Sequence, residues 1–348
     1  MKILIVRVSS LGDVVHNMPM VADLLRHHPE AQIDWVVEEA YAPLIRLNKG
    51  VHRVIPFALR RWRKSLLTAA TRAEIAMFRR TLREVAYDLV FDTQGLLKTG
   101  VVMNQARLAP GGQRIGLANA TEGSGYEAIS RIFHTRSVAV HPRTHAVARA
   151  RRVAADTLHY PIEEPADFLL EAPTVSPAAA GWLPVHSYAV FFHGTARAAK
   201  QWHPAHWVAI GRLLAGRGLQ VLLPWGSAEE HAAARHLANN IPHALVLPQL
   251  PMMDAVVLAS QAALVIGLDS GLTHIAAAYE RPTIELYCDS PRWKTEGNWA
   301  SCIVNLGDMG NPPTVADVAH AVEQLLGPAP AAWPAMERAT TAGPGSNG

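Results

Sequence analysis

Short apolar runs alternate with stretches of helical periodicity along the first half of the chain. We expect strands at five such runs: Lys2–Val8, Ile33–Val37, Arg53–Phe57, Leu89–Asp92 and Arg114–Leu117. Within Ala70–Ala86 the apolar residues recur at spacings of three and four, which predicts a helix with one buried face. An alternation of strands and helices is typical of a parallel sheet covered by helices on both sides.

The second half repeats this pattern. Strands are expected at Tyr188–His193, Leu219–Pro224, Ala244–Leu247, Ala263–Gly267 and Thr283–Tyr287, and helices between them include His206–Ala215 and Glu229–Asn239. We therefore predict an α/β protein with two Rossmann-like parallel-sheet domains facing across a cleft. The predicted boundaries are an N-terminal domain at 1–165, a proline-rich linker at 166–186, a C-terminal domain at 187–326 and a mobile tail at 327–348.

Composition narrows the class of protein. The 348 residues are 49% hydrophobic, which is enough for two ordinary domains, and the net charge of +3 suits a phosphorylated or carboxylated partner. The two cysteines, Cys288 and Cys302, form no disulfide framework or Cys/His cluster, so we expect reduced thiols in a cytosolic protein. The opening "MKILIVRV" is too short for a signal peptide, and no run approaches the roughly 18 apolar residues of a membrane span.

The loop after the first expected strand, "SSLGD", places Asp13 at the carboxyl end of the sheet, where ligands of such folds bind. Asp13 has two interpretations: a first-turn acid that stabilises a helix, or a general base in the cleft. Pro19 indicates that the helix either begins near Asn17 or is kinked after an earlier start. The loop matches neither GxGxxG nor GxxxxGK[ST], which argues against a Rossmann dehydrogenase and a P-loop enzyme.

Two loops of the second half are candidates for binding a diphosphate. In "HGTARAAKQW", Thr195 offers a hydroxyl donor and Lys200 offers positive charge, although the segment is equally compatible with a solvated basic loop. In "GLDSGLTHIAAA", Asp269 or Ser270 is placed to cap a helix whose first amides form an anion site. His274, alone, is more typical of an ordinary helix histidine.

Three further segments follow expected strands or flank the cleft. Glu230 in "LPWGSAEE" is a candidate contact for ribose hydroxyls, and Trp225 for a base, against the simpler roles of a helix acid and a core tryptophan. "RRWRK", at 60–64, is either a solvated loop or a site for an anionic headgroup or acceptor. Gln94 and Lys98 in "FDTQGLLKTG" again lie at the cleft. No stacking platform accompanies the basic residues, so a nucleic-acid partner is not expected.

Taken together, these segments resemble the lipopolysaccharide heptosyltransferases. The resemblance runs in order from residue 1 to about 326 through "VRVSSLGDVVHNMP", "DWVVEEAY", "RVIPFALRRWRK", "DTQGLLK", "HGTARAAKQWHPAHW", "LPWGSAEE" and "LDSGLTHIAAA". It implies a GT-B fold and inverting transfer of L-glycero-D-manno-heptose from ADP-heptose to the Kdo of Kdo-lipid A in inner-core synthesis. "SSLGD" and "DWVVEE" favour the enzymes that add the first heptose; the alternatives are a second-heptose enzyme or another nucleotide-sugar GT-B transferase.

The resemblance also implies roles for individual residues. Asp13 matches the catalytic base, and Lys200 matches the diphosphate-binding lysine that assists departure of ADP. The implied donor-binding residues are Thr195, Lys200, Glu230, Leu250, Asp269, Ser270, Gly271, Leu272 and His274. The implied acceptor-binding residues are Ser9, Ser10, Gly12, Arg60, Arg61, Arg63, Lys64, Gln94, Lys98, His145 and Arg149.

No metal and no cofactor are expected, because the sequence has no DxD-like acidic pair and ADP-heptose is a substrate. The expected partners are ADP-heptose, Kdo-lipid A and the anionic surface of the inner membrane, with the protein peripheral on its cytoplasmic face. Two segments depart from the family pattern. "YCDSPRWKTE", at 287–296, replaces a more usual Tyr-Gly-Pro-Thr pattern, and the acceptor loop at 118–126 is poorly matched, so no site residue is predicted there.

Overall fold

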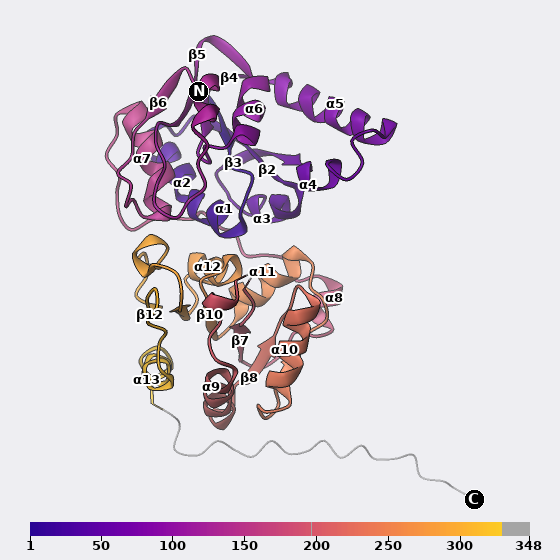
Figure 1. Cartoon of the computed structure of the whole chain (residues 1–348), viewed down its shortest axis with the longest axis vertical. Coiled ribbons are helices and arrows are strands. Elements are labelled where there is room, and N and C mark those ends of the chain that lie inside the picture. Colours follow the sequence, from indigo (N-terminus) through magenta and orange to yellow (C-terminus); the bar gives the residue numbers. More distant parts are fainter. Residues whose placement is uncertain (196, 329–348) are drawn as a thin grey trace, which may run out of the picture.

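The computed structural model describes residues 1–195 and 197–328, which form two domains stacked along the long axis of the molecule (Figure 1). The N-terminal domain contains a six-stranded sheet in the order β3-β2-β1-β4-β5-β6, with every neighbouring pair parallel. Its strands are β1 (Lys2–Val6), β2 (Gln32–Glu38), β3 (Val51–Phe57), β4 (Ala86–Asp92), β5 (Arg107–Leu117) and β6 (Arg136–Val138).

The C-terminal domain contains a second six-stranded parallel sheet, in the order β12-β11-β10-β7-β8-β9. Its strands are β7 (Tyr188–Phe192), β8 (Gln220–Leu223), β9 (Leu245–Val246), β10 (Leu264–Leu268), β11 (Thr283–Tyr287) and β12 (Ile303–Gly307). Counted from its own first strand, this sheet has the same topology as the first. In each sheet the order reverses beside the first strand, and a ligand crevice is expected at that point.

Helices cover both sheets. Those before the second sheet are α1 (Leu11–Asn17), α2 (Pro19–His27), α3 (Ala42–Ile45), α4 (Leu59–Trp62), α5 (Ala69–Glu84), α6 (Leu97–Gln105), α7 (Ala146–Leu158) and α8 (Pro177–Ala180), with 3-10 turns η1 (Glu39–Tyr41) and η2 (Ala128–Phe133). The helices that follow β7 are α9 (Pro204–Gly216), α10 (Ala228–Ala238), α11 (Met252–Gln261), α12 (Gly271–Ala278) and α13 (Val315–Leu326), with turns η3 (Ala198–Lys200) and η4 (Arg292–Lys294).

The predicted strands are confirmed, most of them shifted by a few residues at one end, and the sixth strand of each sheet was missed. β6 has only three residues, and β12 is only partly buried after Ile303 and has no continuous apolar run, so neither gave a strong pattern. Of the two alternatives at Pro19, the structure shows the interruption after an earlier helix start. Helix α1 ends at Asn17 and α2 begins at Pro19, because proline cannot donate the hydrogen bond that would continue α1.

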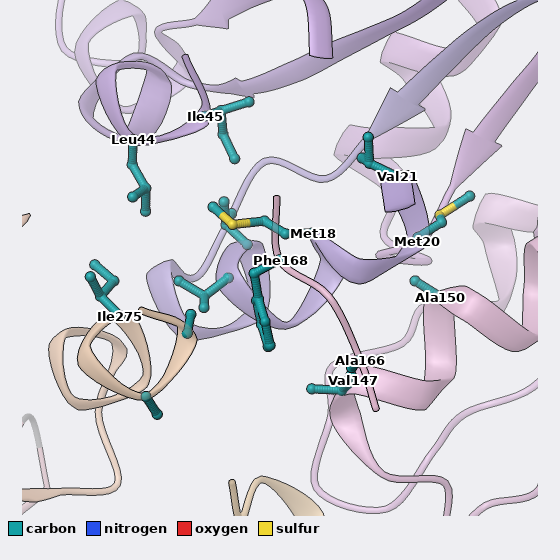
Figure 2. Close-up of a cluster of buried hydrophobic side chains, with 14 of the residues drawn as sticks. Met18, Met20, Val21, Leu44, Ile45, Val147, Ala150, Ala166, Phe168 and Ile275 are labelled. Atoms are coloured by element: carbon teal, nitrogen blue, oxygen red, sulfur yellow. The ribbon is translucent and has the colours of Figure 1, made fainter. Parts of the chain in front are cut away.

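The hydrophobic core is continuous between the domains. Figure 2 shows Ile275, from α12 of the C-terminal domain, facing Leu44 of α3, with Met18 and Phe168 nearby, and all four side chains are at most 4% exposed. Phe168 lies in the segment 166–186 predicted as a linker, which therefore contributes to the core besides containing α8. Most of the predicted tail, residues 329–348, lies outside the described residues.

Candidate active site

Asp13 lies in the first turn of α1, directly after β1. One carboxylate oxygen accepts hydrogen bonds from the backbone amide (3.1 Å) and hydroxyl (2.9 Å) of Ser10, and the other is 2.6 Å from Arg7 and 3.4 Å from Arg149. Burial alone would raise the pKa of Asp13, but the two guanidinium groups and the Ser10 hydrogen bonds outweigh it and hold the pKa below its usual range. Asp13 is thus a first-turn helix acid whose carboxylate is ionised at neutral pH, and its side chain remains 33% exposed.

A cavity of about 650 Å³ opens between the domains beside this carboxylate-bearing helix. We call it the donor cavity. Eight of the nine predicted donor-binding residues line it: Thr195, Lys200, Glu230, Leu250, Asp269, Ser270, Gly271 and Leu272. Leu11 of α1 and Tyr41 of η1 complete its wall from the N-terminal domain, so ligands in this cavity contact both halves of the molecule.

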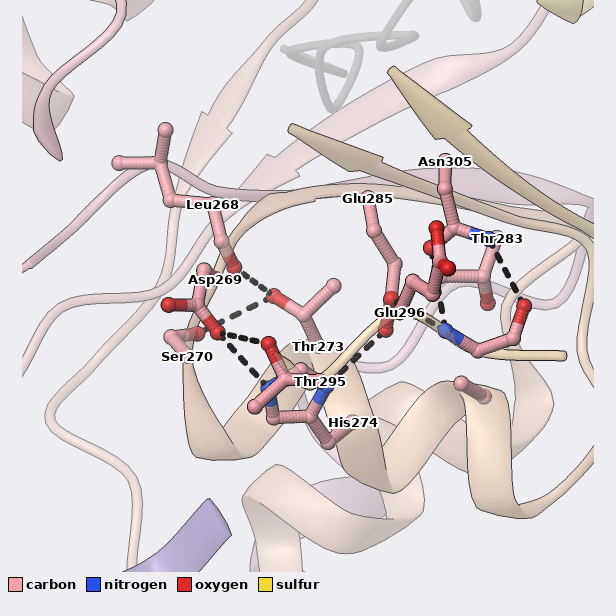
Figure 3. Close-up of polar contacts among 12 residues, drawn as sticks. Leu268, Asp269, Ser270, Thr273, His274, Thr283, Glu285, Thr295, Glu296 and Asn305 are labelled. Atoms are coloured by element: carbon pink, nitrogen blue, oxygen red, sulfur yellow. Dashed lines mark hydrogen bonds and ion pairs between the residues drawn. The ribbon is translucent and has the colours of Figure 1, made fainter. Parts of the chain in front are cut away.

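The ninth predicted donor residue, His274, lies beneath the cavity wall in a chain of charged groups (Figure 3). Asp269 accepts from Lys200 Nζ at 2.7 Å and lies 3.1 Å from His274 Nε2, while His274 Nδ1 lies 3.0 Å from the fully buried Glu285. Burial opposes a charged imidazole, but the carboxylates Glu285 and Asp269 raise the pKa of His274 to about 10. Asp269 stays ionised because His274 and Lys200 overcome the effect of burial and lower its pKa.

Two glycines let the helices of opposite domains meet. A Cβ atom on Gly271 would lie 2.6 Å from Leu11 Cγ, and one on Gly12 would lie 3.3 Å from the His274 ring. The imidazole rings of His16 and His274 also face each other, with centroids 4.4 Å apart. The N-termini of α1 and α12 therefore converge, which brings the loop of Asp13 next to the amides that the sequence predicted as an anion site.

The far end of the donor cavity has polar and flat groups suited to a nucleoside. Glu230 packs over Gly194, where a Cβ atom would have no room, and accepts from the Gly226 amide at 2.7 Å. Trp225 lines the same cavity, donates from its indole to the Leu247 carbonyl at 2.7 Å, and packs on His231. Leu250, which the resemblance implied as a donor contact, lines the same cavity with an apolar side chain.

The predicted acceptor residues fall into separate groups. Ser9, Gln94 and Lys98 form one cluster at the end of β1 and β4: both Gln94 Nε2 (3.3 Å) and Lys98 Nζ (3.1 Å) donate to the Ser9 hydroxyl. Burial and the nearby arginines lower the pKa of Lys98, against the effect of Glu38. Ser9 and Gln94 lie in loops and Lys98 lies in the first turn of α6, all at the carboxyl edge of the first sheet and on the same edge as Asp13.

The basic segment 60–64 has one buried residue, its tryptophan, between exposed basic residues. Trp62 is buried against Phe57 and Phe78 and is therefore a core residue. Arg61 is engaged by two carboxylates, Glu39 at 3.0 Å and Glu74 at 2.7 Å. The remaining members differ in their surroundings: Arg60 approaches the Tyr41 hydroxyl, Arg63 lines a groove that also contains Lys98, and Lys64 is exposed.

His145 and Arg149 lie at the N-cap and in the body of α7. The side chain of His145 accepts from the Val147 amide at 3.3 Å, and its other ring nitrogen lies 3.0 Å from the backbone carbonyl of Glu296 in the C-terminal domain. Arg149 contacts Asp13 and donates to the Thr121 hydroxyl at 3.0 Å. The structure thus places Arg149 beside the carboxylate and His145 at a contact between domains.

Sequence reasoning missed several residues of this region. Arg7 contacts Asp13 most closely, yet in the sequence it was only the residue that interrupted an apolar strand. Glu285 has no polar neighbour in the sequence that would identify it as the partner of His274. Lys294 reaches the Gly123 carbonyl of the other domain from the segment that departs from the family pattern, and that departure was the one available signal.

In residues 1–195 and 197–328, no group of three or more His, Cys, Asp or Glu side chains is arranged to hold a metal ion. Within the same ranges, no helix combines the length and apolar character needed to cross a membrane.

Two Rossmann-like domains of equal topology, with a nucleotide-sized cavity between them and a carboxylate at its edge, define a glycosyltransferase of the GT-B fold. The model of glycosyltransferase family 9 (heptosyltransferase) matches residues 75–320. The chain belongs to this family, which confirms the resemblance and the enzyme class expected from the sequence.

Individual relatives also support membership of this family. The chain is 38% identical to lipopolysaccharide heptosyltransferase 1 of Pseudomonas aeruginosa over 288 residues, 82% of this chain and 78% of the relative. It is 36% identical to lipopolysaccharide heptosyltransferase 1 of Escherichia coli K12 over 290 residues, 82% and 88% of the two chains, and 25% identical to lipopolysaccharide heptosyltransferase 2 of Salmonella typhimurium over 309 residues, 82% of each. The structure of E. coli heptosyltransferase WaaC with ADP superposes with a TM-score of 0.79 at 32% identity, covering 93% of this chain and all of that one.

Proposed function

We propose that this enzyme transfers L-glycero-D-manno-heptose from ADP-heptose to the Kdo of Kdo-lipid A, with inversion at the anomeric carbon. The observation that carries the proposal is the meeting of α1 and α12. It brings the Asp13 loop of one domain against the wall of a nucleotide-sized cavity whose other groups come mainly from the second domain. The similarity to proteins named lipopolysaccharide heptosyltransferase 1, and to a structure with an ADP-heptose analogue, supports the choice of substrates.

ADP fits the donor cavity in one direction. Trp225, Leu250 and Glu230 line the end suited to adenosine, with the Glu230 carboxylate available to ribose hydroxyls. Lys200, Thr195 and the first amides of α12 supply cationic and hydrogen-bonding groups for the diphosphate. Asp269, which Lys200 and His274 hold ionised, is left to accept hydrogen bonds from sugar hydroxyls.

The reaction is a displacement at the anomeric carbon. The acceptor hydroxyl oxygen bonds to that carbon while its proton passes to the Asp13 carboxylate, and the bond from carbon to the diphosphate oxygen breaks with its electron pair leaving on ADP. Positive charge develops on the sugar ring in the transition state, as in glycoside hydrolysis. Arg7 and Arg149 keep Asp13 ionised and oriented, and Lys200 with the α12 amides stabilises the negative charge that grows on the leaving diphosphate.

The acceptor side is assigned to the N-terminal domain. Lys98, Gln94 and Ser9 lie at the carboxyl edge of its sheet, and Arg60, Arg63 and Lys64 extend the positive charge outward from that edge. These cations are complementary to the carboxylates and phosphates of Kdo-lipid A. Arg61, which is already paired with Glu39 and Glu74, requires exchange of one of those partners before it can bind substrate.

A membrane-facing surface is proposed on the same domain. α5, which projects from the body of the domain in Figure 1, together with α6 and η2 exposes apolar side chains including Met77, Leu97, Val101, Ile129 and Ile132. Arginines on these elements, among them Arg72, Arg79, Arg80, Arg83 and Arg131, are exposed as well. Apolar side chains surrounded by cations are typical of proteins that bind anionic bilayers peripherally, here the cytoplasmic face of the inner membrane.

The test is release of ADP from purified enzyme with ADP-heptose and Kdo-lipid A, with the product identified by its added heptose mass. We expect release that depends on both substrates and falls by a factor of about 100 or more in Asp13→Asn. Transfer to an acceptor that already carries the first heptose, but not to Kdo-lipid A, would assign the enzyme to the second-heptose step instead. Because the chain is more similar to the relatives named heptosyltransferase 1, we expect Kdo-lipid A to be preferred.

A further inference from the structure

Residues 293–296, "WKTE", connect the domains across the mouth of the cleft, and we call them the strap. Trp293 faces the guanidinium of Arg143, which lies 4.9 Å from its ring centroid. Lys294 Nζ donates to the carbonyl of Gly123, and the carbonyl of Glu296 meets His145. Three of the four strap residues therefore contact the N-terminal domain, in a segment where the sequence departs from the family pattern.

Among the residues that the structure describes, no carboxylate forms an ion pair with Lys294. The described hydrogen-bond partner of its half-buried ammonium group is a neutral backbone carbonyl. Burial lowers the pKa of Lys294, while the carboxylates of Asp13 and Asp269 act in the opposite direction and Arg149 and Lys200 add to the lowering. The ammonium group thus lies within electrostatic range of the proposed base, the donor carboxylate and both of their cations.

A second cavity, of about 760 Å³, adjoins Lys294. It shares Lys200, Asp269 and Arg197 with the donor cavity. The strap residues Trp293, Lys294 and Thr295 line it as well, together with the loop that contains Gly123 and with Arg143. Its remaining wall includes the carboxylates of Glu122, Asp289 and Asp308, and Asp289 is paired with Arg197 at 2.6 Å. The residues suited to adenosine are on the opposite side of Lys200. A nucleotide-sugar whose diphosphate lies at Lys200 would therefore point its sugar toward this second cavity, where the acceptor must approach.

We propose that Lys294 binds the carboxylate of the acceptor sugar, so that the acceptor is held by the C-terminal domain as well as by the N-terminal one. The transferred heptose is neutral and offers no counter-charge to an ammonium group. The donor diphosphate already has Lys200 and the α12 amides on its own side, and Arg197 is paired with Asp289 at 2.6 Å. The carboxylate of Kdo is the remaining anionic group close to the reacting hydroxyl, and this inference rests on the proposed function for its choice of acceptor.

The consequence is a binding determinant in the segment where this chain departs from the family pattern. A charge-assisted hydrogen bond in a partly buried site contributes roughly a tenfold to hundredfold effect on affinity. Lys294→Met removes the charge and keeps the length of the side chain. Lys294→Gln keeps a hydrogen-bond donor for the Gly123 carbonyl but has no charge, and Lys294→Arg keeps the charge.

The experiment measures binding of Kdo-lipid A in detergent micelles to the ADP-bound protein, and separately the KM for each substrate. We expect Lys294→Met and Lys294→Gln to weaken acceptor binding and raise acceptor KM at least tenfold, with ADP-heptose KM changed less than twofold and Lys294→Arg recovering most of the loss. With an acceptor whose reacting Kdo is a methyl ester, wild type and Lys294→Met should bind equally well.

Three outcomes would overturn the inference. A rise in ADP-heptose KM with both acceptors would place Lys294 at the diphosphate. Wild-type acceptor binding and KM in Lys294→Gln would show that Lys294 only holds the two domains together through the Gly123 carbonyl. Unchanged acceptor binding in Lys294→Met would show that Lys294 has no role in binding the acceptor. Failure of the proposed function appears differently: the wild type would bind Kdo-lipid A in a manner dependent on Lys294 yet transfer no heptose to it.

Discussion

The charge on His274 is the basis of a prediction that can be worked out in magnitude. His274 is 2% exposed and is held between Asp269 and the fully buried Glu285, which keeps it protonated at neutral pH. Replacing it with glutamine removes the titrating group and leaves Glu285 with only the Tyr287 hydroxyl and the Gly297 amide as hydrogen-bond donors among the described residues. Removing one partner of a buried ion pair costs about 3–5 kcal/mol, so we expect His274→Gln to lower the free energy of unfolding by that amount at pH 7.

This difference should shrink as pH rises. The pKa of His274 is about 10 in the folded protein and about 6.5 in the unfolded chain, so between these values the folded state binds the extra proton. A raised pKa gives stability that is fully present below pH 6.5 and is lost toward pH 10. For one proton, the advantage of wild type over His274→Gln should fall by about 2.5 kcal/mol from pH 7 to pH 9.

Urea unfolding of both proteins at intervals from pH 6 to pH 9 measures this change. His320→Gln, which removes a histidine on the outer part of α13, serves as the matched control and should follow the wild type within a few tenths of a kcal/mol at each pH. The double variant His274→Gln/Glu285→Gln, which removes both charges of the pair, should recover part of the lost stability. Parallel wild-type and His274→Gln curves over this range would show that His274 does not carry the extra proton and would refute the argument.

Three other predictions follow from the same site. Lys200→Met should weaken ADP binding roughly tenfold or more by calorimetry, since it removes the cation that contacts Asp269 at the diphosphate position; unchanged ADP affinity would contradict that placement. Because the pKa of Asp13 is lowered, its charge persists as pH falls below its unfolded pKa of about 3.9, so Asp13 should add no acid limb to kcat/KM above pH 5; a limb in that range that moves in Asp13→Glu would be inconsistent with this. Gly271→Ala should lower stability by about 1–3 kcal/mol in thermal unfolding because its Cβ would overlap Leu11, whereas Gly216→Ala, with open space around its Cβ, should be neutral or slightly stabilising.

Much of the fold could be predicted because buried parallel strands are continuous apolar runs. The runs at Lys2–Val6 and Thr283–Tyr287 are bounded by polar loops, so their positions follow from the hydrophobic pattern. β6 has three residues, and β12 is only partly buried after Ile303, so the apolar pattern of both strands is weak. The core shared by Phe168 and Ile275 was also beyond prediction, since it depends on how the two domains face each other.

The segments on the donor side could be located from the sequence because they follow strands of the second sheet, and the family resemblance then implied the individual residues. The positions of Lys200, Asp269 and Glu230 around one cavity agree with that reasoning, and their individual roles stay predictions. Long-range partners left no local signal: Arg149 lies 136 residues from Asp13, and Lys294 lies 171 residues from Gly123. His274 owes its charge to carboxylates that only the fold brings beside it, so the electrostatics of the site required the tertiary structure.

The apolar continuity between the domains affects how the molecule unfolds. Because Ile275 packs with Leu44 and Met18 across the boundary, separating the halves would expose hydrocarbon on both of them to water. Neither half should then melt as an autonomous unit, and calorimetry of the intact chain should record a single endotherm. If the connecting segment were cut and the halves separated, each half would still contain a complete six-stranded sheet but would expose an apolar surface to water. We therefore expect each separated half to self-associate.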